Sequence, residues 1–189
     1  MVGVAIVCEG KNDRDFLEEI INHHFGSDAK NINFYIFRGK SDLLQATHQR
    51  YENLQNLINA GQIKKVLFVV DADNRKNDNI FGGYENTKTS LNNTIEQLGL
   101  ISISQTYIMC YPETKLGYLE SLILSTIDPA QRNCIECFLN CSQFESKENH
   151  KAILNKIYNM AYPNAPYDFS HHHFDELKTK LTQLFIESK

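Results

Sequence analysis

Two aspartates stand one residue apart directly after an apolar segment. Residues 66–70 read VLFVV, and Asp71 and Asp73 follow with one alanine between them. In an extended chain, side chains two residues apart point to the same side, so the two carboxylates are expected to lie close together. At about 4 Å and an effective dielectric of about 20, two such charges repel by roughly 4 kcal/mol. A proton on one acid or a bound cation would relieve that repulsion, so the pair is a candidate for metal binding.

A third carboxylate follows another apolar segment. Residues 2–8 (VGVAIVC) run into Glu9, just as residues 66–70 run into Asp71. In open parallel α/β sheets, ligands bind beyond the carboxyl ends of the strands, which is where these acids are expected. Glu9, Asp71 and Asp73 would then form a site of three carboxylates, whose hard oxygen ligands suit Mg²⁺ or Mn²⁺. The alternative is that the acids are simply solvated at the ends of their strands.

A fourth carboxylate falls within an expected apolar helix. In residues 116–127 (LGYLESLILSTI), Glu120 lies between Leu116 and Ile123 on the apolar face. A buried carboxylate is costly unless it is paired or bound to a metal, so Glu120 is a candidate supporting acid of the site. The alternative places Glu120 at the edge of the apolar stripe, in an ion pair with a lysine or an arginine.

The apolar pattern indicates strands that alternate with helices over the first 110 residues. Strands are expected at 2–8, 33–37, 66–70 and 102–110, and helices around 13–24, 44–58, 91–98, 116–127, 131–140, 147–160 and 174–186. Such alternation requires right-handed crossovers and gives a parallel sheet covered by helices. The predicted fold class is therefore α/β, with a Rossmann-like parallel sheet in residues 1–128 and a helical C-terminal extension in residues 129–189 packed on it.

The composition is that of an ordinary globular protein, with 189 residues, 42% hydrophobic and 22% charged. The formal net charge of −4 argues against a surface made for non-specific DNA binding, although a local basic groove is compatible with it. No apolar run approaches the roughly 18 residues that a membrane span needs. Five cysteines without a recognisable signal peptide favour reduced thiols and a cytoplasmic location, without a membrane partner.

Two short motifs resemble those of the Toprim domain, which topoisomerases, bacterial primases and overcoming-lysogenization-defect nucleases share. They are Glu-Gly after the first expected strand and Asp-x-Asp after the third. The chain resembles small stand-alone Toprim-like proteins of uncharacterised function more closely still, because these carry a Glu-Gly-Lys-x-Asp start, a Pro…Gly-x-Leu-Glu segment and a Lys-rich helical tail. The matching residues here are Glu9-Gly10-Lys11-Asn12-Asp13, Pro112 with Gly117-Tyr118-Leu119-Glu120, and Lys151 with the tail YDFSHHHFDEL. The similarity thus covers nearly the whole chain.

The resemblance implies roles for the acids at the strand ends. In Toprim domains the glutamate acts in acid–base chemistry or holds metal, and the aspartates coordinate Mg²⁺. It implies that Glu9 is a general acid, a general base or a ligand, and that the two aspartates of the motif 71–73 are ligands. Topoisomerase-type members often carry a further acid two residues on, where this chain has Arg75. Asp78 or Glu120 could substitute for that acid from another position.

Basic residues flank the expected site. Lys11 and Lys115 could hold a phosphate or stabilise charge on a leaving group. Arg75 and Lys76 lie in the long polar stretch 71–86 and are candidates for contacting a nucleic-acid backbone. The alternative for each is a solvated side chain on the surface.

Two other groups of possible metal ligands have more than one interpretation. Cys134, Cys137 and Cys141 are spaced i, i+3, i+7, which fits one buried face of a helix and lacks the fourth ligand of a zinc or iron–sulfur site. The run His171 to His173 could bind a metal, or it could cap or precede the last helix.

Three functions fit these residues. The first is a Mg²⁺- or Mn²⁺-dependent phosphotransfer enzyme of the Toprim type, a nuclease acting on DNA or RNA. Its candidate residues are Glu9, Lys11 and Glu120 for catalysis, Glu9, Asp71 and Asp73 for the metal, and Arg75, Lys76 and Lys115 for the substrate. The second is a non-catalytic Toprim-like module that binds nucleotide, nucleic acid or a protein. The third is a haloacid-dehalogenase-like phosphatase, because VVDAD also resembles the nucleophile strand of that family and Asp71 would then attack phosphate.

Overall fold

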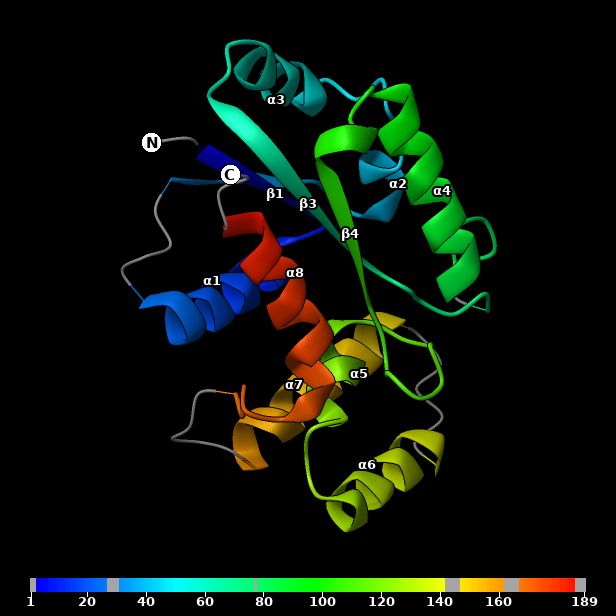
Figure 1. Cartoon of the computed structure of the whole chain (residues 1–189). Coiled ribbons are helices and arrows are strands. Elements are labelled where there is room, and N and C mark those ends of the chain that lie inside the picture. The colour runs from blue at the N-terminus through cyan, green and yellow to red at the C-terminus, as the bar shows by residue number, and fades with distance from the viewer. Residues whose placement is uncertain (1–2, 27–30, 77, 142–146, 162–166, 186–189) are drawn as a thin grey trace.

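The central element of the fold is a sheet of four parallel strands in the order β2-β1-β3-β4 (Figure 1). The computed structural model describes residues 3–26, 31–76, 78–141, 147–161 and 167–185. The strands are β1 (Gly3–Cys8), β2 (Ile32–Ile36), β3 (Ile63–Asp71) and β4 (Ser104–Met109). The predicted α/β class with a Rossmann-like parallel sheet is confirmed.

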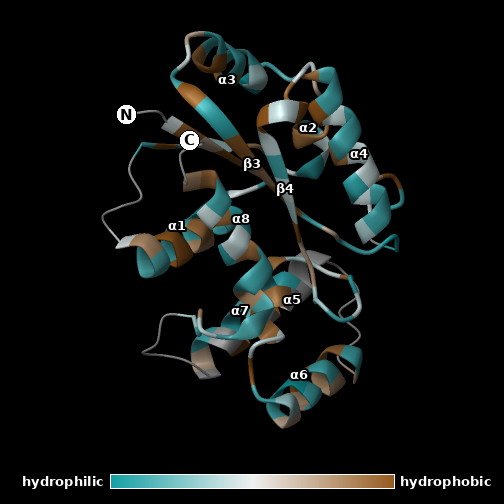
Figure 2. Cartoon of the chain, viewed as in Figure 1, coloured by the Kyte–Doolittle hydropathy of each residue, from teal (hydrophilic) through white to brown (hydrophobic). Residues whose placement is uncertain are grey.

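The two central strands are apolar on both faces, as the strands of a covered parallel sheet must be. Along β1, Ile6 packs into the core on one face and Val7 into the core on the other. Along β3, Leu67 and Phe68 divide between the two faces in the same way. Figure 2 shows the apolar colour of β3 in the interior and hydrophilic colour along the outer side of α4. Burial of both faces explains why these strands are continuous apolar runs in the sequence.

Helices cover both faces of the sheet. One face packs against α1 (Lys11–Phe25), α5 (Leu119–Leu124) and α8 (Asp175–Phe185), and the other against α2 (Lys40–Leu43), α3 (Arg50–Asn59) and α4 (Tyr84–Gln97). The remaining elements are α6 (Pro129–Cys141), α7 (Lys147–Ala161) and the 3₁₀ turns η2 (Ile101–Ile103) and η3 (His172–Phe174). The C-terminal helix α8 buries Leu177, Leu181 and Leu184 in the same core as β1, so it belongs to the packing of the sheet. The division at residue 128 stays a prediction.

Two predicted helices differ from the observed ones. The single helix expected over 44–58 is wrong, because α2 ends at Leu43 and α3 begins at Arg50. The helix expected from Leu116 begins only at Leu119, since Gly117 has a φ of +93°, which ends helical geometry there. Leu116 is consequently 46% exposed and does not belong to the core.

The buried face predicted for the three cysteines of α6 is also wrong. Cys134, Cys137 and Cys141 are exposed free thiols. The helix instead packs against the core through Ile135 and Leu139, which lie on its other side. Within the described ranges, no helix is both long enough and apolar enough to cross a membrane.

Candidate functional site

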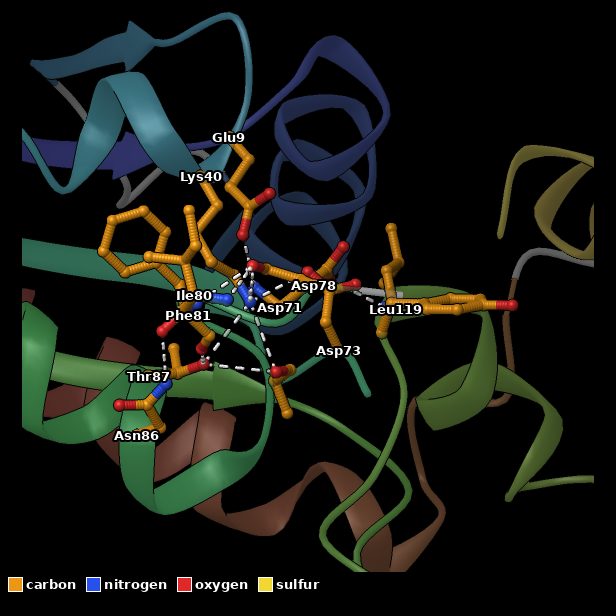
Figure 3. A network of polar contacts seen from close by, with 12 residues as sticks. Glu9, Lys40, Asp71, Asp73, Asp78, Ile80, Phe81, Asn86, Thr87 and Leu119 are labelled. Carbon is orange, nitrogen blue, oxygen red and sulfur yellow. Dashed lines mark hydrogen bonds and ion pairs between the residues drawn. The ribbon is translucent and has the colours of Figure 1, made fainter. Parts of the chain in front are cut away.

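Four predicted acids converge at the carboxyl edge of the sheet, and Figure 3 shows three of them, Glu9, Asp71 and Asp73. Glu9 follows β1, Asp71 ends β3, Asp73 follows two residues later, and Glu120 lies in the first turn of α5. All four are buried and line one cavity of about 500 Å³. The topology brings them together because the carboxyl ends of β1 and β3, which are paired in parallel, meet at one edge.

The cavity contains more acidic than basic side chains. Its carboxylates are Glu9, Asp13, Asp71, Asp73, Asp78 and Glu120, and its basic groups are Lys11, Arg38, Lys40 and Lys151. An excess of carboxylates in a largely buried space favours the uptake of protons or of a cation.

Asp71 is bonded to three separate elements of the fold. Its Oδ1 accepts a hydrogen bond from the backbone N–H of Leu119 at 3.0 Å, at the start of α5. Its Oδ2 accepts from Lys151 Nζ on α7 at 2.7 Å. The Asp71 N–H donates to Glu9 Oε1 at 2.8 Å, which ties the two strand ends together. Three separate elements therefore hold Asp71 in place.

Asp73 does not continue the strand. Its φ is +59°, so the expectation that it shares one side of an extended chain with Asp71 is wrong. An antiparallel bridge to Gly117 fixes this conformation, with the Asp73 N–H donating to the Gly117 carbonyl at 2.6 Å and the Gly117 N–H returning a bond of 3.3 Å. The carboxylate Oδ2 lies 2.8 Å from Lys40 Nζ in a buried ion pair.

Lys40 is a site residue that the sequence prediction missed. Its side chain is 4% exposed, and its ammonium donates to the Ala72 carbonyl at 3.2 Å and to Thr87 Oγ1 at 3.3 Å besides pairing with Asp73. Asp78 Oδ2 lies 4.0 Å away. The signal was the position of Lys40 shortly after β2, since that strand ends at the same edge of the sheet as β1.

Glu120 is buried as predicted, with 4% of its surface exposed. Its Oε1 accepts a hydrogen bond from Asn155 Nδ2 of α7 at 2.9 Å. Its Oε2 is buried and has no hydrogen-bond partner among the described residues. Burial, opposed by Lys151 and reinforced by Asp71, raises the pKa of Glu120. A buried carboxylate oxygen without a donor is a position at which a cation would be favourable.

Burial shifts the titration of two further acids. It raises the pKa of Glu9 to about 8, with repulsion from Asp71 acting in the same direction and Lys40 opposing it. It raises the pKa of Asp13 to about 7, again with repulsion from Asp71, while Lys151 opposes the shift. Asp13 also accepts the Gly10 N–H at 2.8 Å at the start of α1. Both carboxyl groups therefore keep their proton to a higher pH than an exposed carboxyl group does.

The carboxylate oxygens of the cavity suit a hard divalent cation, provided that the ion pairs with lysine rearrange. All the acidic ligands are oxygens, as Mg²⁺ requires, and Glu120 supplies an oxygen without a donor. However, lysine ammoniums neutralise Asp71 and Asp73 in this structure. Among the described residues, the three side chains whose ligand atoms gather within 4.8 Å of one another are His171, His172 and His173, and not these acids. A cation would therefore compete with Lys151 for Asp71.

Comparison with known proteins places the chain in a family. The model of the family DUF3226, described as a protein of unknown function, matches residues 4–185. The chain belongs to DUF3226. No curated protein and no solved structure matches it. The matched range contains every acid of the cavity, so the whole candidate site lies within the family match.

The predicted basic residues of this DUF3226 chain lie in two places. Lys11 lines the acidic cavity, as expected. Arg75 and Lys115 line a different cavity of about 430 Å³, where Lys115 Nζ lies 5.1 Å from the centre of the Tyr84 ring. Lys76 is exposed, and its backbone N–H donates a hydrogen bond of 3.0 Å to Oδ1 of Asn74, two residues earlier. The role of these three residues in binding substrate stays a prediction.

We expect Gly117→Ala to lower the free energy of unfolding of this DUF3226 chain by about 1–3 kcal/mol. The positive φ disfavours any side chain, and an added Cβ would lie 2.3 Å from Ser121 Oγ. Gly99→Ala is the matched control, because Gly99 also has a positive φ but has nothing within 4 Å of the added carbon. Urea unfolding of both variants measures the difference. Equal losses would show that the contact with Ser121 relaxes freely and that only the backbone conformation matters.

Proposed function

We propose that the acidic cavity is a divalent-cation-dependent phosphoryl-transfer site of the Toprim type, and that the protein is a nuclease. The observation that carries the proposal is the convergence of Glu9, Asp71, Asp73 and Glu120 on one cavity at the carboxyl edge of a parallel sheet. This is the edge at which α/β sheets bind ligands. The orphaned oxygen of Glu120 adds a second reason for a cation there.

In this proposal Glu9, Asp71 and Asp73 hold Mg²⁺ or Mn²⁺, and Glu120 is the supporting acid. When bound, the metal would neutralise developing charge on the phosphate and position a water. Without a metal the pKa of Glu9 is raised to about 8. A bound cation would favour its ionised form, which is the form that ligates the metal or accepts a proton. Lys11 and Lys151 supply ammonium groups at the same cavity, where they would attract a phosphate.

Nucleic acid as the substrate is supported by the resemblance to Toprim nucleases and by the position of the second cavity. Arg75 and Lys115 line that cavity, and Arg75 follows Asp73 by only two residues. A strand whose phosphate lies at the acids would have a neighbouring phosphate within reach of these basic groups. The two cavities would then bind successive parts of one chain.

The test is metal binding and cleavage measured on the same variants. Wild-type protein is expected to bind Mg²⁺ or Mn²⁺ in calorimetry and to cleave labelled single-stranded DNA, double-stranded DNA or RNA when Mn²⁺ is present. Asp71→Asn should reduce cleavage by at least about 100-fold, because a neutral amide is a poorer ligand for Mg²⁺ than a carboxylate and carries no charge to pair with Lys151. Asp42→Asn is the matched control, since Asp42 is 39% exposed and lies outside the cavity.

A second function, a non-catalytic Toprim-like binding module, is favoured by one observation. Lys151 and Lys40 already pair with Asp71 and Asp73, and an internal ammonium could serve as a permanent counterion in place of a metal. Calorimetry separates the two functions. Absence of Mg²⁺ and Mn²⁺ binding at millimolar concentration, together with no cleavage, would favour the binding module.

A further inference from the structure

Three consecutive histidines form a compact cluster at the start of the C-terminal helix. His171 precedes η3, and His172 and His173 lie within it. One ligand atom from each ring lies within 4.8 Å of the others, and the ring centres are 4.3–4.5 Å apart. His171 has a φ of −59° and a ψ of 137°, so the chain turns from extended into 3₁₀ geometry at this residue. This turn gathers three rings that would diverge along a straight strand.

A hydrogen bond to Ser125 determines which nitrogen of His173 carries the proton. Ser125 donates its single hydroxyl hydrogen to the Leu122 carbonyl. With that bond in place, the 2.7 Å contact between Ser125 Oγ and His173 Nδ1 fits the tautomer in which Nδ1–H donates to the hydroxyl oxygen. The lone pair of neutral His173 is then on Nε2. Metal-binding histidines are commonly oriented in this way by a partner on the other ring nitrogen.

Capping of the 3₁₀ turn accounts only in part for the position of the His171 ring. Its Nδ1 accepts the His173 backbone N–H at 3.2 Å, a long bond that a metal ligand could replace. The cap and the bond to Ser125 account for the rings of His171 and His173, but not for the exposed ring of His172 that stacks on His171. His172 is exposed and the other two are half-buried, so an ion in solution can reach the cluster.

The charges around the cluster favour a cation. Asp168 and Asp175 interact electrostatically with His171, and Glu113 does so with His173. The nearby basic group is Arg132, which opposes them, and Lys178 pairs with Asp175 at 2.7 Å. Three carboxylates and two basic groups thus act on the cluster, and a neighbouring carboxylate or a water could complete the coordination.

We propose that His171, His172 and His173 form a binding site for a transition-metal ion of the Zn²⁺ class, separate from the acidic cavity. Imidazole nitrogens are ligands that Zn²⁺ and its neighbours prefer, whereas Mg²⁺ prefers oxygen. Two nitrogens on one tetrahedral Zn²⁺ are about 3.3 Å apart, so the rings need to close only modestly from their present spacing. Three protein ligands leave a further position for water or a carboxylate.

The test is titration of the full chain with Zn²⁺ by calorimetry and with Co²⁺ by visible absorption, which reports the coordination geometry. The wild type is expected to bind one ion of each. His172→Gln should weaken binding at least about 10-fold without disturbing the cap at His171, and the triple glutamine variant should abolish it. Ser125→Ala should weaken binding by a similar factor, because it removes the partner that orients His173.

The controls locate the ion. His23 and His24 on α1 are exposed, so their glutamine variants should bind like the wild type. Replacing the exposed cysteines of α6 by serine tests whether thiolates bind the ion instead, and Asp71→Asn tests the acidic cavity. The proposal is overturned if the wild type binds no Zn²⁺ at about 0.1 mM, which is on the order of the Kd of a weak metal site. It is also overturned if binding survives in the triple histidine variant. Neither result depends on whether the acids bind Mg²⁺.

Discussion

Asp73→Ala is expected to lower the free energy of unfolding by about 3–5 kcal/mol. Asp73 and Lys40 form a buried ion pair of 2.8 Å in which both side chains are less than 5% exposed. Removing the carboxylate leaves the buried ammonium 4.0 Å from Asp78 Oδ2, beyond hydrogen-bond distance, and beside two neutral acceptors, the Ala72 carbonyl and Thr87 Oγ1. These two acceptors compensate only in part for a lost negative charge. Alanine also fits the positive φ of this position less well than aspartate does.

Urea unfolding of three proteins tests this effect. A double variant, Lys40→Met with Asp73→Leu, removes both charges and should recover part of the loss, because a buried pair can be replaced by apolar groups at little cost. Asp15→Ala is the matched control, since Asp15 pairs with Arg14 on the exposed side of α1 and should cost at most about 1 kcal/mol. If Asp73→Ala loses as little free energy of unfolding as Asp15→Ala, the Lys40 ammonium is compensated by water or by another acid. The buried pair would then not stabilise the fold.

Glu9 is expected to make the protein less stable as the pH rises from about 5 to 8 in the absence of a divalent cation. The unfolded state releases this proton near pH 4.5, whereas the folded state keeps it until the pKa of about 8. Between these values the folded state binds more protons, so the stability falls with rising pH and levels off above 8. A difference of one pH unit in pKa corresponds to about 1.4 kcal/mol, so the free energy of unfolding should fall by roughly a few kcal/mol in total. Asp13, with a pKa of about 7, acts in the same direction.

Glu9→Gln should remove about half of this slope, because an amide has the hydrogen-bonding shape of the protonated acid but does not titrate, while Asp13 keeps a contribution of similar size. Unfolding by urea at pH 5, 6, 7 and 8 measures the slope for each protein. Glu18→Gln is the matched control, since Glu18 is exposed on the outer side of α1 and should leave the slope unchanged. Parallel curves for the wild type and Glu9→Gln would show that Glu9 titrates normally. Added Mg²⁺ should flatten the wild-type curve if the acids bind the metal, because it favours the ionised form.

The amino-acid sequence determined the sheet and the convergence of its acids. Continuous apolar runs at residues 3–8 and 66–70 are buried on both faces, and parallel pairing of such strands brings their carboxyl ends to one edge. The positions of Glu9 and Asp71 follow from that rule alone. The burial of Glu120 also followed from its place among apolar side chains, although the helix begins three residues later than expected.

Only the tertiary structure decided what neutralises these acids. Lys151 lies 80 residues after Asp71 on a separate helix, and no spacing rule relates two such positions. The left-handed conformation of Asp73 depends on its bridge to Gly117, a long-range contact that local sequence does not specify. In the same way, the proton position of His173 depends on Ser125, 48 residues earlier. Strand ends obey a local and periodic pattern, whereas partners between distant helices are chosen by packing, and this is why the acids were predicted and their lysines were not.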